Sequence, residues 1–280
     1  MNDILKNKKI CFVGGGNMAQ ALVSGLLGKG IIPKHVTVID PNEDKRQYLA
    51  SKGVNTTTPQ QATEKALVEA DVIVLAVKPQ VMHKVVADFA TVLKEQLVIS
   101  VAAGLSTQAI AAMLGGYQNI VRAMPNTPAM IQMGATGMYA TDAINDSQKQ
   151  LATEVMAASG LVLWVENEAQ MHAVTAVSGS APAYVFYFIE SMVDGAIELG
   201  LDRKQATALA MQTVLGAAQM SITSDETPAQ LRRNVTSPNG TTQAAIESMQ
   251  ANNVGELIAQ AMQACYKRSE QISSEMSSQT

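Results

Sequence analysis

Residues 9–19 read KICFVGGGNMA. A short, mostly apolar run at residues 9–13 is followed by three glycines at residues 14–16. The apolar run at residues 9–13 predicts a buried strand, and the pattern at residues 17–27 predicts a helix. The glycines therefore lie at a junction from strand to helix. At this junction Gly14, Gly16 and Ala19 form the pattern G-x-G-x-x-A.

In a strand–turn–helix unit this pattern binds the pyrophosphate of a dinucleotide. Gly14 permits the tight turn, Gly16 lets the backbone approach the phosphates, and Ala19 keeps the helix close to the strand. The N–H groups at the start of the helix then face the phosphates, so Asn17 and Met18 join the candidate cofactor-binding residues. A turn that is rich in glycine for another reason is the alternative. The position of the pattern near the start of a strand–helix–strand repeat favours the cofactor site.

The first half of the chain repeats this alternation of strand and helix. Apolar runs at residues 36–39, 71–77, 97–101 and 119–123 predict further strands, and shorter strands are expected around residues 134–140 and 161–165. Because each run is apolar almost throughout, the sheet is expected to be parallel and covered by helices on both faces. The sequence thus predicts an α/β fold, with an N-terminal Rossmann doubly wound sheet.

The pattern changes after residue 165, and the rest of the chain predicts only helices. We expect residues 1–165 to form the dinucleotide-binding domain and residues 166–280 an all-helical dimerisation and substrate domain. The helix expected at residues 181–197, APAYVFYFIESMVDGAI, is apolar on nearly all sides, so most of its surface must be buried against other helices. A homodimer through the C-terminal helices would provide that cover, and a monomeric helix bundle is the alternative. An assembly of several dimers stays open.

Asp40 ends the second predicted strand, about twenty residues after the glycines, where dinucleotide-binding domains meet the adenine ribose. A carboxylate there accepts hydrogen bonds from the 2′-hydroxyl and repels a 2′-phosphate, which favours NADH. Lys45 and Arg46 follow closely, however, and could pair with that phosphate. The choice between NADH and NADPH is therefore left open.

The carboxyl ends of the next two strands are expected to hold the nicotinamide, because ligands of open α/β sheets bind at this edge. Small residues there leave room for a flat ring. Lys78 has an alternative interpretation as an ordinary surface lysine. The candidates are Ala76, Val77, Lys78 and Pro79 after the third strand, and Ala102, Ala103 and Gly104 after the fourth.

Composition and charge exclude several classes of function. The 280 residues carry a formal net charge of −4 and no run of Lys or Arg, so we expect no nucleic-acid partner. No apolar stretch is long enough to cross a membrane, and we expect a cytoplasmic protein. Cys11 and Cys265 have no Cys or His neighbours at ligand spacing, so neither a metal site nor a disulfide framework is expected.

Residues 236–242, TSPNGTT, precede the helix expected to begin near residue 241. Hydroxyl groups and free backbone N–H groups at a helix N-terminus form an anion site that suits a carboxylate. An ordinary helix cap is the alternative, and this segment alone does not decide between them. The candidate residues for binding a substrate are Ser237, Asn239, Gly240, Thr241 and Thr242.

Several motifs in one order resemble the pyrroline-5-carboxylate reductase family over nearly the whole chain. They are GGGNMA at residues 14–19, AVKP at 76–79, AAG at 102–104, MPNTP at 124–128, SGSAPAY at 178–184 and PAQLRRNVTSPNGTTQAAIESMQ at 228–250. The resemblance implies a Rossmann domain followed by a helical dimerisation domain. It also implies reduction of 1-pyrroline-5-carboxylate to L-proline by NADPH or NADH, the last step of proline biosynthesis.

The resemblance also implies roles for single residues. The loop that matches residues 237–242 holds the substrate carboxylate in this family, and Thr242 corresponds to a threonine near the ring nitrogen, a candidate proton donor. Asn126 joins the cofactor-binding candidates. Two residues depart from the family pattern: Asn239 stands where Gly is usual, and Asp40 where many members carry Ser. Asn tolerates the left-handed conformation, so we expect the loop to keep its shape.

Two other functions compete with this interpretation. The β-hydroxyacid dehydrogenases share the two-domain plan but carry a catalytic Lys on the first long helix after the Rossmann domain. No lysine lies between Lys149 and Lys204, so such an enzyme would lack its proton acceptor. A non-catalytic NAD(P) sensor would keep the glycine turn but would not need a loop such as residues 237–242.

Overall fold

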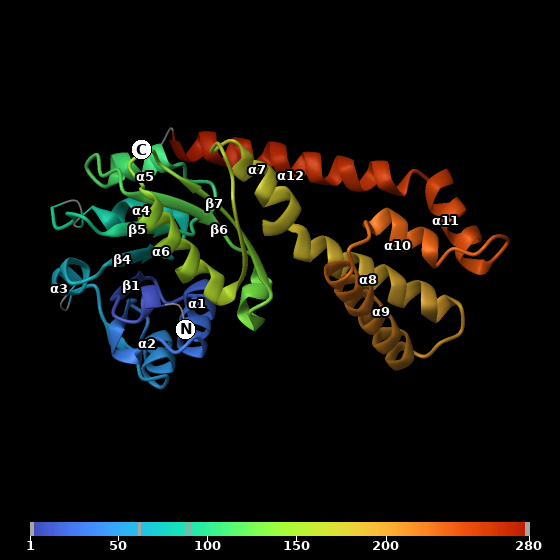
Figure 1. Cartoon of the computed structure of the whole chain (residues 1–280), viewed down its shortest axis with the longest axis horizontal. Helices are drawn as coiled ribbons and strands as arrows, with labels where there is room; N and C mark the ends of the chain where they lie inside the picture. Colours follow the sequence, from blue (N-terminus) through green and yellow to red (C-terminus); the bar gives the residue numbers. More distant parts are fainter. Residues whose placement is uncertain (1–2, 61–62, 88, 90, 278–280) are drawn as a thin grey trace. The chain divides into compact units, whose positions relative to one another are not determined.

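An eight-stranded sheet organises the first part of the chain in the computed structural model, which describes residues 3–60, 63–87, 89 and 91–277 (Figure 1). The strand order is β3-β2-β1-β4-β5-β6-β7-β8. Neighbouring strands are parallel except β6 and β7, which pair antiparallel. The strands are β1 (Ile10–Val13), β2 (Val36–Ile39), β3 (Asn55–Thr57), β4 (Val72–Leu75), β5 (Leu97–Ser100), β6 (Ile120–Met124), β7 (Gly134–Ala140) and β8 (Gly160–Trp164). The first six positions follow the order of a dinucleotide-binding sheet, so the predicted Rossmann fold is confirmed.

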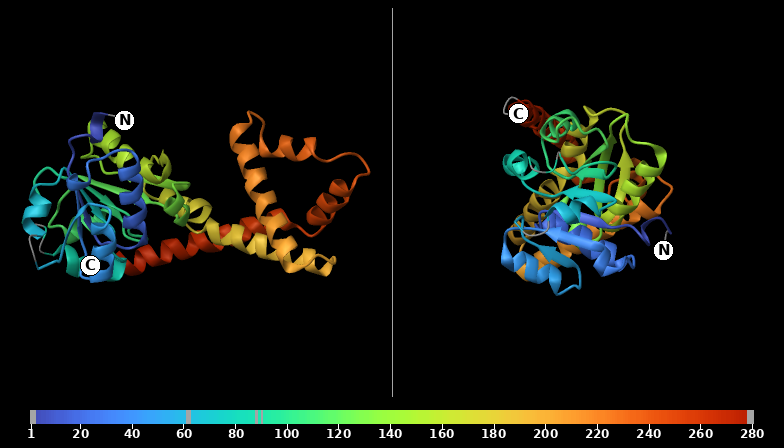
Figure 2. Two further views of the ribbon diagram at one scale, coloured as in Figure 1. Left: turned by 90° about the horizontal axis from the view of Figure 1, so that it is seen from below. Right: turned by 90° about the vertical axis from the view of Figure 1, so that its left-hand side faces the viewer.

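Helices cover both faces of this sheet (Figures 1 and 2), which explains the continuous apolar runs. Along β1, Ile10 and Phe12 enter one core with residues of α1 and α6, whereas Cys11 and Val13 enter the other with residues of α4 and α5. The helices of this part are α1 (Asn17–Gly28), α2 (Glu43–Ala50), α3 (Thr63–Val68), α4 (Pro79–Val86), α5 (Thr107–Met113) and α6 (Asp146–Met156), with short 3₁₀ turns η1 (Asp3–Leu5), η2 (Pro33–His35), η3 (Thr127–Ile131) and η4 (Ala157–Ser159).

The predicted helices of the second half are also confirmed, with shifts at some ends. They are α7 (Gln170–Val174), the π-helical turn η5 (Thr175–Gly179), α8 (Ala181–Glu198), α9 (Arg203–Thr223), α10 (Pro228–Asn234), α11 (Thr241–Ala251) and α12 (Val254–Ser277). Local signals set their starts: Asp202 and Gln205 form a capping box before α9, and Pro228 occupies the first turn of α10. Within the described ranges, no helix combines the length and the apolar character needed to cross a bilayer.

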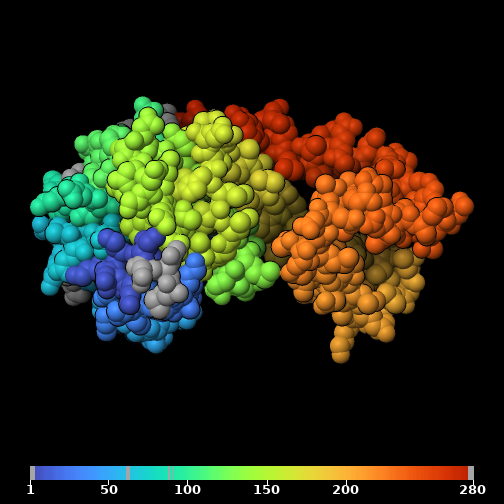
Figure 3. Space-filling model, in the orientation of Figure 1, coloured from blue at the N-terminus to red at the C-terminus, as the bar shows by residue number. Residues whose placement is uncertain are grey.

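The chain divides into two compact units, residues 1–180 with 265–280 and residues 181–264. Residues just after 165 belong to the sheet unit because they pack on it: the side chain of Val174 lies against Gly137, and Met124 lies against Gly179. The last part of α12 returns to the same unit, where Met276 contacts the core beneath α4 and α5. The functional division proposed at residue 165 stays a prediction. In Figure 3 the second unit is the gold-to-orange surface.

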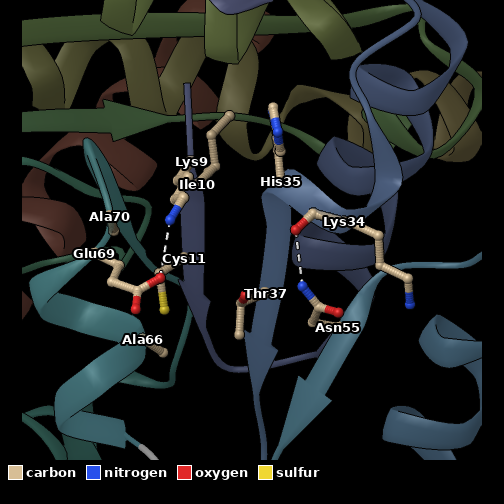
Figure 4. A pocket seen from close by; sticks show the side chains of 10 residues that line it. All are labelled: Lys9, Ile10, Cys11, Lys34, His35, Thr37, Asn55, Ala66, Glu69 and Ala70. Atoms are coloured by element: carbon tan, nitrogen blue, oxygen red, sulfur yellow. Dashed lines mark hydrogen bonds and ion pairs between the residues drawn. The ribbon is translucent and has the colours of Figure 1, made fainter. Parts of the chain in front are cut away.

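A small polar cleft of about 100 Å³ lies at the amino ends of β1, β2 and β3 (Figure 4). Lys9, His35 and Asn55 line it, together with Cys11. Burial raises the pKa of the Cys11 thiol to about 12, so the thiol stays protonated at neutral pH and is a poor nucleophile. The cleft lies at the opposite edge of the sheet from the glycine turn, which follows the carboxyl end of β1.

Candidate active site

Gly14 and Gly16 of the glycine turn differ in backbone conformation and in the space around them. Gly14 has a φ of 102°, and a Cβ there would lie 2.6 Å from the backbone oxygen of Ala76. Gly16 is the N-cap of α1 with φ −70° and ψ −179°, and no heavy atom would lie within 4 Å of its Cβ. No side chain caps the start of α1. The first N–H groups of this helix are therefore not bound by a capping side chain, and the space at the Cβ position of Gly16 is open.

Asp40 is buried at the end of β2 and is bound to the turn. Its Oδ2 accepts a hydrogen bond from the N–H of Gly15 at 2.7 Å, and its Oδ1 accepts one from Asn42 at 2.8 Å. The Nζ of Lys45 lies 3.7 Å from Oδ2, and the guanidinium of Arg46 donates to the backbone oxygen of Asp40 at 2.8 Å. Lys45 thus lies beside the carboxylate that was expected to select the cofactor, and Arg46 binds the backbone of the same residue.

The two segments expected beneath the nicotinamide follow β4 and β5 at the same edge of the sheet. Ala76 is fixed by its N–H, which donates to the oxygen of Val13 at 2.8 Å. Lys78 is exposed at the start of α4, and Pro79 occupies the first turn of that helix. In the second segment Ala102 is buried, whereas Gly104 has a φ of 81° and contacts Ile272.

Asn126 follows β6, and its side chain is engaged within the protein. Its amide group donates to the backbone oxygen of Ser178 at 3.2 Å, and its Oδ1 accepts from the N–H of Ala135 at 2.9 Å. Ser178 in turn donates its hydroxyl to the oxygen of Ala135 at 3.0 Å. Asn126 thus joins β7 to the π-helical turn, a structural role that its presence in the MPNTP motif did not indicate.

These residues fit a dinucleotide cofactor. The structure has open space at Gly16, uncapped N–H groups at the start of α1 and a buried acid at the end of β2. These are the features that contact phosphate and ribose in dinucleotide-binding sites. All of the predicted cofactor residues lie in the sheet unit, most of them at the carboxyl edge of its parallel strands.

The predicted substrate loop belongs to the other compact unit, between α10 and α11. Asn239 has a φ of 57°, the left-handed conformation expected of it. A Cβ on Gly240 would lie 2.4 Å from the hydroxyl of Ser237, so any other residue there would require that hydroxyl to move. Gly240 is also the N-cap of α11 and provides no side-chain cap, which leaves the first N–H groups of α11, including those of Thr241 and Thr242, unbound by a capping side chain.

One polar cluster near the cofactor edge was not predicted. Glu168 accepts hydrogen bonds from the N–H of Thr107 at 2.7 Å, from its hydroxyl at 2.7 Å and from the guanidinium of Arg122 at 3.0 Å. The sequence contains one signal of it: Arg122 stands in the middle of an apolar strand, and a buried arginine needs an acidic partner.

Comparison with known proteins links both halves of the chain to one enzyme family. The family model described as pyrroline-5-carboxylate reductase dimerisation matches residues 168–272, and that described as NADP oxidoreductase coenzyme F420-dependent matches residues 9–104. A pyrroline-5-carboxylate reductase of Pseudomonas aeruginosa is 43% identical over 97% of this chain and 99% of its own length. The chain belongs to the pyrroline-5-carboxylate reductase family.

Solved structures of the pyrroline-5-carboxylate reductase family agree with this assignment. The structure from Coxiella burnetii has a TM-score of 0.91 and 42% identity, and covers 96% of this chain and 99% of its own. The structure from Plasmodium falciparum, solved with NADP bound, has a TM-score of 0.84 and 28% identity, and covers 96% and 99%. The chain is therefore an oxidoreductase that uses NAD(P)H, which decides against the non-catalytic sensor. Its membership of the reductase family decides against a β-hydroxyacid dehydrogenase.

Proposed function

We propose that this chain reduces 1-pyrroline-5-carboxylate to L-proline with NADPH or NADH. The observation that carries the proposal is the pair of open helix N-termini: one at Gly16 for the cofactor phosphates and one at Gly240 for a carboxylate. The full-length identity to reductases of this name supports the same reaction.

The loop of residues 237–242 binds the substrate in this proposal. The N–H groups of Thr241 and Thr242 at the start of α11 donate to the carboxylate, and Asn239 and Gly240 give the backbone the shape that exposes them. The hydroxyl of Thr242 forms a hydrogen bond with the ring nitrogen and fixes the orientation of the C=N bond. Ser237, the first residue of the loop, supplies a second hydroxyl.

Few catalytic groups are needed for this chemistry. The protonated cyclic imine is already an electrophile at C5, so the protein has mainly to align the ring and exclude competing orientations. When bound, the reduced nicotinamide supplies the hydride. In this proposal the nicotinamide end of the cofactor is supported by residues 76–79 and 102–104 and by Asn126. Its phosphates are held by Gly14, Gly16, Asn17, Met18 and Ala19. Its adenine ribose is contacted by Asp40.

Oxidation of NADPH and of NADH, each with and without 1-pyrroline-5-carboxylate, tests the reaction.

The Asp40→Ser variant tests the selection of the cofactor. We expect this substitution to raise the ratio of kcat/KM for NADPH to that for NADH by about tenfold or more, because a 2′-phosphate no longer faces a carboxylate. The substitution also removes the hydrogen bonds to Gly15 and Asn42, but that loss weakens both cofactors alike and leaves the ratio unaffected. An unchanged ratio would show that Asp40 does not face the ribose.

We further propose that the enzyme is a homodimer through its C-terminal helices. The second unit has a small buried core of Val193, Ala206 and Ala210, and it leaves large apolar side chains exposed, including Tyr187 at 70%. An apolar groove of about 960 Å³ runs between helices α8, α11 and α12. A family model named for dimerisation covers this region. A second copy of the chain would bury the apolar area that the unit leaves exposed.

Replacing Leu257 by Asp tests the dimer, because Leu257 lines this groove. We expect the variant to elute as a monomer, or to lose much of its thermal stability, because a buried carboxylate without a partner strongly opposes association. Light scattering coupled to size exclusion measures the mass. Ile32→Asp is the matched control, an exposed apolar residue of the sheet unit, and it should keep the wild-type mass. A Leu257→Asp variant with the wild-type mass and stability would argue against this interface.

The proposal places the enzyme in the cytoplasm. Both cysteines, Cys11 and Cys265, are free thiols in the structure, as is usual in a reducing compartment.

A further inference from the structure

The carboxylate of Glu168 joins three segments that are far apart in the sequence. Glu168 lies just before α7, Thr107 is the first residue of α5, and Arg122 lies in β6. One carboxylate oxygen accepts from both the Thr107 N–H and Arg122, and the other accepts from the Thr107 hydroxyl. All three donors therefore point at one carboxylate, and all of them belong to the same compact unit.

Burial makes this contact specific. The side chain of Arg122 is 4% exposed and that of Glu168 is 23% exposed. A buried guanidinium strongly favours an acceptor that is charged and correctly placed. Glu168 is thereby held in one position, and through its two hydrogen bonds to Thr107 it fixes the start of α5.

The start of α5 is also the end of the loop expected to support the nicotinamide. This loop, residues 101–106, leaves β5 with the N–H of Val101 bonded to the oxygen of Leu75 at 3.1 Å. At its middle, Ile272 of α12 closes over Gly104, where a Cβ would lie 2.6 Å from the Ile272 side chain. Glu168 holds its other end at Thr107. The loop is therefore fixed at both ends and covered at its centre.

We propose that Glu168 is a positioning residue: by fixing Thr107, it holds the loop of residues 101–106 in the position that orients the nicotinamide ring. This inference rests on the proposed function, because that function places the nicotinamide beside Ala102, Ala103 and Gly104. Glu168 itself touches neither substrate nor cofactor in this proposal. Loss of its carboxylate should leave the cofactor bound by its phosphates but poorly oriented at its reactive ring.

A purely structural role for Glu168 would give a different result. It would lower the melting temperature or the fraction of folded enzyme, while each folded molecule would still bind the ring as the wild type does. The readout must therefore report on the ring and not on activity alone. The fluorescence lifetime of the reduced nicotinamide in the binary complex with NADPH reports how firmly the ring is held.

Glu168→Gln keeps the size of the side chain and removes its charge. The NH₂ group of the glutamine replaces one acceptor oxygen and cannot accept a hydrogen bond from Thr107 or Arg122. Thr107→Val removes only the hydroxyl and leaves the ion pair with Arg122 intact, so it stays informative if Glu168→Gln fails to fold. Thr107→Ser keeps the hydroxyl and should restore wild-type behaviour. Glu69→Gln is the matched control: Glu69 forms an exposed ion pair with Lys9 at 2.9 Å, at the amino edge of the sheet.

In Glu168→Gln and Thr107→Val we expect the lifetime of bound NADPH to shorten toward that of the free cofactor. The Kd for NADPH should stay within about threefold of the wild type, because the phosphate turn is untouched. With 1-pyrroline-5-carboxylate, kcat should fall by about tenfold to a hundredfold, because a small misplacement of reacting atoms has effects of that size. Thr107→Ser and Glu69→Gln should match the wild type in all three measurements.

Wild-type lifetimes in folded Glu168→Gln and Thr107→Val would overturn the proposal, as would a wild-type complex whose lifetime equals that of free NADPH. The lifetime measurement needs no substrate. A wild-type protein that shows no oxidation of NADPH with 1-pyrroline-5-carboxylate would therefore count against the proposed function, while the lifetimes of the variants would still decide the role of Glu168.

Discussion

Replacing Gly16 by valine should weaken the binding of NADPH and NADH by about a hundredfold, equivalent to about 2.7 kcal/mol, while the free protein should keep its fold. The new side chain fits the apo structure, because no heavy atom lies within 4 Å of the Cβ position and the backbone is extended with φ −70° and ψ −179°. In the proposed function, that same space is where the cofactor phosphates approach the N-terminus of α1. Titration of NADPH fluorescence measures the Kd.

Gly28→Val provides the control, because Gly28 ends the same helix and a Cβ there also meets open space. It should bind both cofactors as the wild type does. The free energy of unfolding of Gly16→Val should fall only by the effect of a poorer N-cap, about 1 kcal/mol. If Gly16→Val bound NADPH with wild-type affinity, the phosphates would not lie at this turn.

Removing the hydroxyl of Thr242 should have the second large effect. In Thr242→Val we expect kcat/KM for 1-pyrroline-5-carboxylate to fall by about a hundredfold, because the ring nitrogen loses its hydrogen bond in the transition state. The Kd for NADPH should not change, since Thr242 contacts the substrate and not the cofactor in this proposal. Steady-state kinetics at saturating cofactor measure the loss.

Thr242→Ser keeps the hydroxyl and should recover most of the activity. Thr223→Val removes an exposed hydroxyl at the end of α9, where it is bonded to the oxygen of Gln219, and should leave kcat/KM unchanged. Wild-type kcat/KM in Thr242→Val would exclude a role for this hydroxyl in the reaction.

The fold was largely predictable because the strands of a doubly wound sheet are buried on both faces. Runs such as residues 36–39 are apolar except for Thr37, and the structure places β2 at these four residues. The edge strand β3, Asn55–Thr57, was missed because its sequence, NTT, carries no apolar residue. The π-helical turn η5 was also missed, since the helical spacing of apolar residues does not distinguish a π-helix from an α-helix.

The candidate site was predictable only where a local pattern encodes it. The glycine turn and the loop of residues 237–242 are each one continuous stretch of sequence. Spacing and residue type marked both as candidates, and the family resemblance favoured a substrate site over a helix cap for the loop. The bond between Asp40 and Gly15 and the cluster around Glu168 join residues that are distant in the sequence. A buried arginine such as Arg122 predicts that an acid lies nearby, but it does not indicate which acid.

The most direct test of the account is the stoichiometry of the reaction. Purified protein is incubated with 1-pyrroline-5-carboxylate and either NADPH or NADH, and both the L-proline formed and the cofactor oxidised are quantified. The account predicts one L-proline for each cofactor oxidised with at least one of the two cofactors. Folded protein that binds the cofactor but forms no proline with either of them would contradict it.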